Sequence, residues 1–194
     1  MKEMKTLALR LFIITAFAAF ILSLVNNFTS PVIADRRAKE LEESLRLAYS
    51  DADEIVKDDE SEVSSLLEKT ENSAVKEVFK CSKNGETTGY VYRVVSKRGY
   101  GGSIEFIVGI ENSGETTGFK VLSSQETPGF GKKAEEEAFE EGVKENNVNS
   151  GELVAAENPS TDTDIQGISG ATISTNCILR GLNAAANVHK GLVK

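Results

Sequence analysis

Residues that hold metal ions or drive nucleophilic catalysis are scarce in this 194-residue chain, which has two cysteines and one histidine. Cys81 and Cys177 lie far apart and outside any Cys-x-x-Cys spacing, which excludes a self-contained zinc or iron–sulfur site by ligand count. We expect two buried free thiols, although an oxidising compartment would also permit one disulfide. His189 alone offers little for metal or triad chemistry. We expect it on the surface near the end of a helix, where partial positive charge is favourable.

Basic residues are outnumbered, with 22 Lys and Arg against 30 Asp and Glu and a formal net charge of −8. Nucleic-acid binding requires clustered Lys and Arg, so the composition predicts no nucleic-acid partner. The acidic residues concentrate in Asp51–Glu62 and Glu135–Glu145. We interpret both runs as solvated faces.

One apolar run near the start of the chain is long enough to cross a lipid bilayer. Leu11–Val25 has only Thr15 and Ser23 as polar residues. A helix extended back to Leu7 would be about 28 Å long at about 1.5 Å per residue, close to the hydrocarbon thickness of about 30 Å. We therefore predict a transmembrane anchor over residues 1–29 and a single-pass membrane protein.

Charge next to this run bears on its orientation. Lys2, Lys5 and Arg10 favour a cytoplasmic N-terminus and an extracytoplasmic main domain, although a basic cluster after the run, residues 36–39, weakens the asymmetry. A cleaved signal peptide is the competing interpretation, but no clear Ala-x-Ala cleavage site follows Val25. We prefer an uncleaved anchor.

Residues 30–194 are predicted to form one α+β domain, an antiparallel sheet packed by helices. Ser30 and Pro31 suit a helix N-cap and first position, so a helix is expected from there to about Tyr49. β-Branched and aromatic residues predict four strands in a meander, separated by Asn-Gly, glycine-rich and Asn-Ser-Gly turns. The expected strands are 75–81, 88–96, 103–110 and 117–123, and further helices are expected over 62–69, 133–144 and about 174–190, with a loop running from 145 to about 164.

The first of two unusual loops, from Ser169 to Thr175, stands immediately before the last predicted helix. Gly170 and Ala171 would let a ligand approach the backbone, and the first helical turn offers unpaired N–H donors and a positive dipole end. Ser169, Thr172, Ser174 and Thr175 add hydroxyl groups. The loop is compatible with a phosphate site, but from spacing alone we prefer the interpretation as an ordinary helix cap.

The second loop, Gln125–Gly131, follows a predicted strand. Pro128 and Gly129 suit a type II turn, with glycine at positive φ. Glu126 and Thr127 would then flank a rigid corner, and Phe130 offers a flat apolar surface. A simple strand-to-helix connection is the alternative, and it is the pairing of the two loops that favours a binding site.

Together these motifs, ETPGFG from Glu126 and SGAT ending at Thr172, resemble those of the G subunit of the Rnf complex, a membrane ferredoxin:NAD oxidoreductase. The likeness extends over essentially the whole chain and, more distantly, to the C subunit of the sodium-translocating NADH:quinone reductase. In one respect the chain departs from the family, because Gln166 stands where the attachment signature usually has Asp, six positions before the acceptor Thr.

The resemblance implies a covalent FMN, joined through its phosphate to Thr172, with its ring against the Glu126–Gly131 loop. It also implies an electron carrier that works with other membrane subunits of the same redox complex and is matured by a flavin transferase. On this view the chain is a subunit of an ion-translocating oxidoreductase rather than a complete enzyme. The cofactor-binding residues are expected to be Glu126, Thr127, Gly129, Phe130, Ser169, Gly170, Ala171, Thr172, Ser174 and Thr175.

Two functions from other classes remain open at this stage. A flavin-free scaffold subunit could use the acidic faces and the membrane-proximal helix to hold neighbouring membrane proteins. An extracytoplasmic sensor could bind a soluble phosphorylated ligand reversibly at the same helix end. A colourless native protein would favour the scaffold, and release of the ligand on dialysis under denaturing conditions would favour the sensor.

Overall fold

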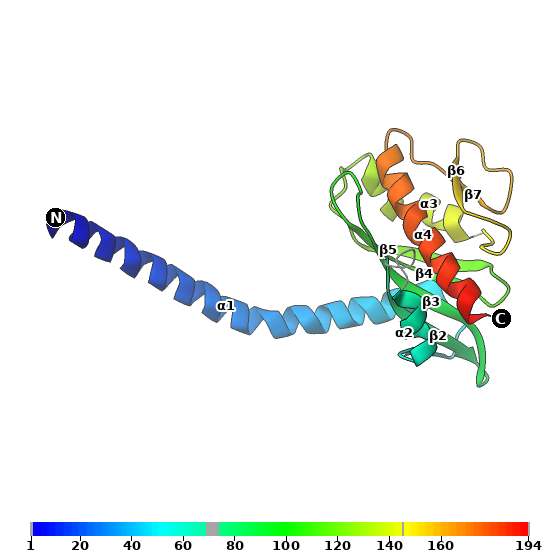
Figure 1. Ribbon diagram of the computed structural model, residues 1–194, viewed down its shortest axis with the longest axis horizontal. Helices are drawn as coiled ribbons and strands as arrows, with labels where there is room; N and C mark the ends of the chain where they lie inside the picture. Colours follow the sequence, from blue (N-terminus) through cyan, green and yellow to red (C-terminus); the bar gives the residue numbers. More distant parts are fainter. Residues whose placement is uncertain (1, 69–73, 145, 194) are drawn as a thin grey trace. The chain divides into compact units, whose positions relative to one another are not determined.

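A computed structural model describes residues 2–68, 74–144 and 146–193 of the chain (Figure 1). The chain divides into two units, Met1–Glu42 and Glu43–Lys194. The predicted boundary between a membrane anchor (residues 1–29) and an extracytoplasmic domain (residues 30–194) describes where the chain leaves the membrane, and it stays a prediction.

Helix α1 (Lys2–Ala48) makes up the first unit and enters the second. By length and composition, its N-terminal apolar stretch could cross a membrane. A signal sequence near an N-terminus meets the same two criteria. The expectation that a new helix begins at Ser30 and Pro31 is wrong, because α1 runs through Pro31 without a break. Proline removes one backbone N–H, and Ser and Thr side chains help membrane helices to tolerate it.

The second unit is built on a five-stranded antiparallel sheet in which the strands pair in chain order. The predicted meander is confirmed as β2 to β5. The first strand was missed, because its four residues lie within an acidic run that was interpreted as solvated surface. The strands are β1 (Glu54–Lys57), β2 (Val75–Lys83), β3 (Glu86–Ser96), β4 (Ile104–Glu111) and β5 (Thr116–Ser123).

Around the sheet lie α2 (Ser61–Leu67), the 3-10 helix η2 (Gly131–Glu135), α3 (Glu137–Lys144) and α4 (Thr172–Leu192). The single helix predicted over 133–144 is broken at Glu136, which has the extended backbone angles φ −88° and ψ 143°. The loop predicted up to residue 164 contains a small parallel pair, β6 (Val154–Ala156) and β7 (Asp164–Gln166). Strands of three residues leave too short a pattern to be recognised.

Helix α4 lies across one face of the sheet and supplies much of the core (Figure 1). Gly181 permits the close approach, since a Cβ there would lie 2.7 Å from the Phe106 ring and 2.8 Å from Val94. The hydroxyl of Ser96, at the end of β3, donates to the Cys177 carbonyl at 2.6 Å. These contacts bring the first turns of α4 to one end of the sheet, where the C-terminal ends of β3 and β5 lie beside the N-terminal end of β4.

The end of α1 crosses the opposite face of the sheet. The Thr117 hydroxyl donates to the Ala48 carbonyl at 2.6 Å, and Gly118 lies directly beneath Ala48. Gly89 lies in the same way beneath the Tyr49 ring. Thr-Thr-Gly occurs near the start of both β3 (87–89) and β5 (116–118), and in each copy the glycine lets the end of α1 pack closely on this face.

Both cysteines are buried and free, as predicted. The expectation for His189 is wrong, because its side chain is 0 % exposed. Its Nδ1 lies 2.9 Å from the Tyr92 hydroxyl on β3, so the histidine joins α4 to the sheet. The residue falls on the apolar side of α4, where burial outweighs the preference of histidine for a helix end.

Acid should therefore destabilise the domain. Burial lowers the pKa of His189 from 6.5 to about 4. Between these values the unfolded chain binds a proton that the folded chain does not, so stability falls as the pH drops from 6.5 towards 4. The free energy of unfolding should decrease by about 3 kcal/mol over this window. Urea unfolding of the full chain in detergent at a series of pH values measures it.

A His189→Gln variant is the control, because glutamine does not titrate. It should be less stable at pH 7 and should lose this part of the pH dependence, so subtracting its profile removes the contribution of the carboxylates. An identical pH profile for the variant would contradict the assignment.

Candidate functional site

The two loops predicted to act together meet at one pocket of about 280 Å³. The loop after β5 and the start of α4 form two sides of it, and the turn between β3 and β4 adds a third. The lining residues are Tyr100, Glu126, Thr127, Phe130, Gly131, Gly170, Ala171 and Ser174.

Glu126 connects these three segments. Its side chain is only 3 % exposed, and both of its oxygens accept hydrogen bonds. Oε2 accepts from the Ser174 hydroxyl at 2.6 Å, and Oε1 accepts from the Gly101 amide at 2.9 Å. A buried carboxylate is tolerated only when donors replace its hydration, and these two donors do so. Glu126 thus holds the pocket together as well as lining it.

Close packing between the loops depends on two glycines. A Cβ on Gly131 would lie 2.5 Å from both Glu126 Oε2 and the Ser174 hydroxyl. Gly170 has φ +75°, and a Cβ there would lie 3.2 Å from the Phe130 ring. Phe130 therefore lies beside Gly170, which links ETPGFG directly to SGAT.

The turn predicted at Pro128 and Gly129 is present. Gly129 has φ +78°, and the Phe130 amide donates to the Thr127 carbonyl at 3.1 Å. This is the arrangement of a type II turn with proline and glycine at its centre. The turn leaves Phe130 about half exposed, at 53 %, next to the pocket.

The hydroxyl groups at the start of α4 divide into two kinds. Ser169 and Thr172 are exposed, whereas Ser174 and Thr175 are buried. Ser174 donates to Glu126, and Thr175 accepts from the Ile168 amide at 3.1 Å and donates to the Ala171 carbonyl at 3.1 Å. Thr172 is the first residue of α4 and follows the lining residue Ala171. Of the predicted hydroxyls, Ser169 and Thr172 therefore face solvent, and the other two hold the loop.

The N-terminus of α4 retains the features of an anion site. Ala171 is the N-cap residue and has no side-chain oxygen with which to cap the helix. The first intrahelical bond at this end runs from the Thr175 amide to the Ala171 carbonyl, so the amides of the first turn precede it. Such amides and the helix dipole favour a negatively charged group.

Sequence reasoning predicted the turn between β3 and β4, residues 97–103, but missed its contribution to the site. Its Gly99–Gly102 segment was interpreted only as a connection, but Tyr100 lines the pocket and the Gly101 amide binds Glu126. An aromatic residue flanked by glycines is unusual for a plain hairpin turn, and this signal could have identified it.

Gln166 lies at the end of β7, paired with Ala156, and is exposed. The neighbouring Asp164 is occupied elsewhere, because its carboxylate accepts from the Ser160 and Thr161 amides at 3.0 and 3.1 Å. These hydrogen bonds lower the pKa of Asp164. Asp164 therefore closes a local turn before the strand that leads to SGAT.

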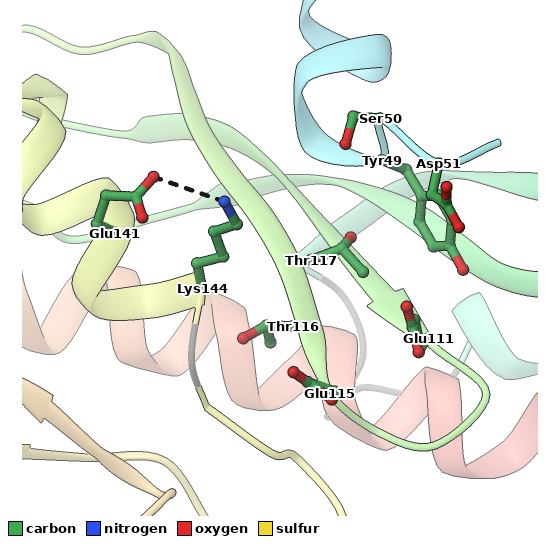
Figure 2. A pocket seen from close by; sticks show the side chains of 9 residues that line it. All are labelled: Tyr49, Ser50, Asp51, Glu111, Glu115, Thr116, Thr117, Glu141 and Lys144. Atoms are coloured by element: carbon green, nitrogen blue, oxygen red, sulfur yellow. Dashed lines mark ion pairs between the residues drawn. The ribbon is translucent and has the colours of Figure 1, made fainter.

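A second pocket, of about 340 Å³, lies on the face of the sheet crossed by the end of α1 (Figure 2). Its lining includes four carboxylates and Lys144, which pairs with Glu141 at 3.7 Å. Among the described residues, no group of three or more His, Cys, Asp or Glu is arranged to hold a metal ion. Tyr49 is the one aromatic residue in its lining, whereas Tyr100 and Phe130 both line the first pocket. Its lining residues are Tyr49, Ser50, Asp51, Glu111, Glu115, Thr116, Thr117, Glu141 and Lys144.

Comparison with known proteins finds a matching domain family and similar subunits of redox complexes. Residues 99–187 match the FMN-binding domain family, a range that includes every residue lining the first pocket. The chain is 29 % identical to the G subunit of the proton-translocating ferredoxin:NAD(+) oxidoreductase complex of Clostridium ljungdahlii, over 89 % of this chain and 84 % of that one. It is 28 % identical to the G subunit of the Na(+)-translocating complex of Acetobacterium woodii, over 97 % and 92 %.

Solved structures share the fold. The crystal structure of Shewanella oneidensis NqrC matches with a TM-score of 0.60 at 17 % identity, over 82 % of this chain and 96 % of that one. The C subunit of the Na(+)-translocating NADH-quinone reductase of Parabacteroides distasonis matches with a TM-score of 0.51 at 20 % identity, over 61 % and 63 %. The resemblance inferred from the two motifs is confirmed: over most of its length the chain is similar to the G subunits of ion-translocating ferredoxin:NAD(+) oxidoreductase complexes, and it shares the fold of NqrC.

Proposed function

We propose that the chain is an electron-carrying subunit of an ion-translocating ferredoxin:NAD oxidoreductase complex, holding FMN through a phosphoester to the Thr172 hydroxyl. The single observation that carries this proposal is the junction of ETPGFG and SGAT at one pocket, with an exposed threonine beside it. The similarity to these G subunits over most of the chain supports the redox role.

The residues present fit FMN. Ligand pockets commonly measure about 300–1,000 Å³, and this one, at about 280 Å³ and open to solvent beside Phe130, suits part of a ligand rather than a whole buried one. Phe130 offers an aromatic surface for a flat ring. Bound FMN would supply the electron-transfer chemistry, which the side chains of the pocket do not provide.

Each part of the site has a distinct task in this proposal. The amides of the first turn of α4 favour the negative charge of a phosphodiester, by about 0.3–1 kcal/mol for an exposed helix end. Glu126 holds the loops at a fixed separation through Ser174 and Gly101. The type II turn presents Phe130 to the pocket. None of these tasks requires a general acid or base, which agrees with a carrier rather than a complete enzyme.

The N-terminal helix supports a membrane location for the protein. We propose that α1 anchors the protein in the lipid bilayer, with its N-terminus in the cytoplasm and the FMN domain outside. The partners would then be other membrane subunits of the same complex, with a flavin transferase acting during maturation. A covalent cofactor suits that compartment, because a protein outside the cytosol cannot replace a lost FMN from the cytosolic supply.

Substitution of Thr172 should abolish covalent attachment. When the chain is co-expressed with a flavin transferase, the tryptic peptide 145–180, which contains Thr172, should gain the mass of FMN minus water. Thr172→Val should lose this mass and the flavin fluorescence of the denatured protein. Ser169→Ala, which removes a neighbouring exposed hydroxyl, should retain both. Covalent flavin on the Thr172→Val chain would refute the site assignment.

Thr175→Val should give the opposite result. It leaves the buried Ile168 amide without its acceptor, which should cost about 1–3 kcal/mol in the free energy of unfolding. The added mass should remain, because the Thr175 hydroxyl is committed to the loop. Thr172→Val, at an exposed site, should change stability by less than about 0.5 kcal/mol. Both variants are compared by urea unfolding without the transferase, and loss of the mass from Thr175→Val alone would move the acceptor by one turn.

A further inference from the structure

Tyr100 is an aromatic side chain with no evident role in folding. It is 72 % exposed, among the most exposed large apolar side chains of the second unit, and it lines the same pocket as Phe130. It comes from the turn between β3 and β4, outside both motifs that carried the functional assignment. An exposed aromatic side chain gains little from folding, so its place at the pocket calls for another explanation.

The backbone on each side of Tyr100 packs tightly against the pocket. A Cβ on Gly99 would lie 2.5 Å from Glu126 Oε1 and 2.6 Å from the Gly102 carbonyl oxygen. A Cβ on Gly101 would overlap the Gln125 carbonyl group. Tyr100 is thus the one position among these three where the turn has room for a side chain.

Hydrogen bonds hold this turn in place. The Gly99 amide donates to the Gly102 carbonyl at 2.7 Å and closes the turn. The Gly101 amide donates to Glu126 at 2.9 Å and fixes the turn to the loop that carries Phe130. Two aromatic residues from different segments are therefore held beside one pocket through a single buried carboxylate.

We propose that Tyr100 is a further flavin-contacting residue, which together with Phe130 shields the isoalloxazine ring from solvent. The inference rests on the proposed function and adds a residue to it. Aromatic rings pack favourably against a flat π-system, and tyrosine can do so while its hydroxyl stays in water. Tyr100 is exposed because the surface it covers belongs to the cofactor.

Flavin emission tests the contact directly. A phenol touching the ring quenches flavin fluorescence by reversible electron donation to the excited flavin, and a covering side chain also limits access by iodide. The full chain carrying its flavin, in detergent at native pH, is compared with Tyr100→Ala and Tyr100→Phe. Val154→Ala on β6, an exposed apolar residue that does not line the pocket, is the control.

Tyr100→Ala should raise the native flavin emission several-fold and increase its quenching by iodide. Tyr100→Phe should raise the emission but keep the resistance to iodide, and Val154→Ala should change neither. Emission and iodide access that are unchanged in a fully flavinylated Tyr100→Ala chain would overturn the inference and leave the proposed function intact. Absence of covalent flavin from the unsubstituted chain would overturn both the proposed function and the inference about Tyr100. Loss of covalent flavin from the Tyr100→Phe chain would overturn the shielding role alone, since that variant keeps the aromatic ring.

Discussion

The pocket depends on one buried carboxylate. Glu126 accepts a hydroxyl hydrogen bond from α4 and an amide hydrogen bond from the β3–β4 turn, and no other described residue hydrogen-bonds to all these segments. Removing either donor would leave a buried charge without full compensation, which is among the costlier changes a protein can suffer. Glu126 therefore couples all three segments, while Cys177 and Arg180 also bind α4 to backbone carbonyls at the start of the β3–β4 turn.

The same carboxylate explains the glycines around it. Gly99 and Gly131 approach Glu126 from two sides, and a Cβ on either would lie 2.5 Å from a carboxylate oxygen. Gly170 has its own reason, a positive φ and a close approach to Phe130. In sequence, such glycines are typical of flexible linkers. In the fold, they allow the backbone to pack closely against Glu126 and Phe130. Tyr100 and Phe130, the two aromatic residues in the pocket lining, are both exposed.

Local chemistry was enough to predict β2 to β5, α4 and the turn at Gly129, because β-branched strands, helical periodicity and Pro-Gly each act over a few residues. Tertiary context decided the rest. His189 is buried because α4 presents that position to Tyr92, and α1 continues through Pro31 although proline usually begins a helix. Tyr100 joins the site through a hydrogen bond between residues 25 apart in the chain. A local pattern contains no information about such partners.

On the proposed function, a tether on the helix changes what the pocket must accomplish. Thr172 is exposed, yet it begins a helix whose core-facing side is buried against the sheet, so a cofactor attached there would have an anchor that is both accessible and fixed. A ligand tethered at such a point reaches its pocket at an effective concentration in the millimolar range, as for short linkers in general. A small, open pocket that would hold free flavin weakly is then sufficient, because it has only to orient the ring. On the proposed function, the loops therefore contribute orientation and shielding, while the covalent bond supplies the affinity.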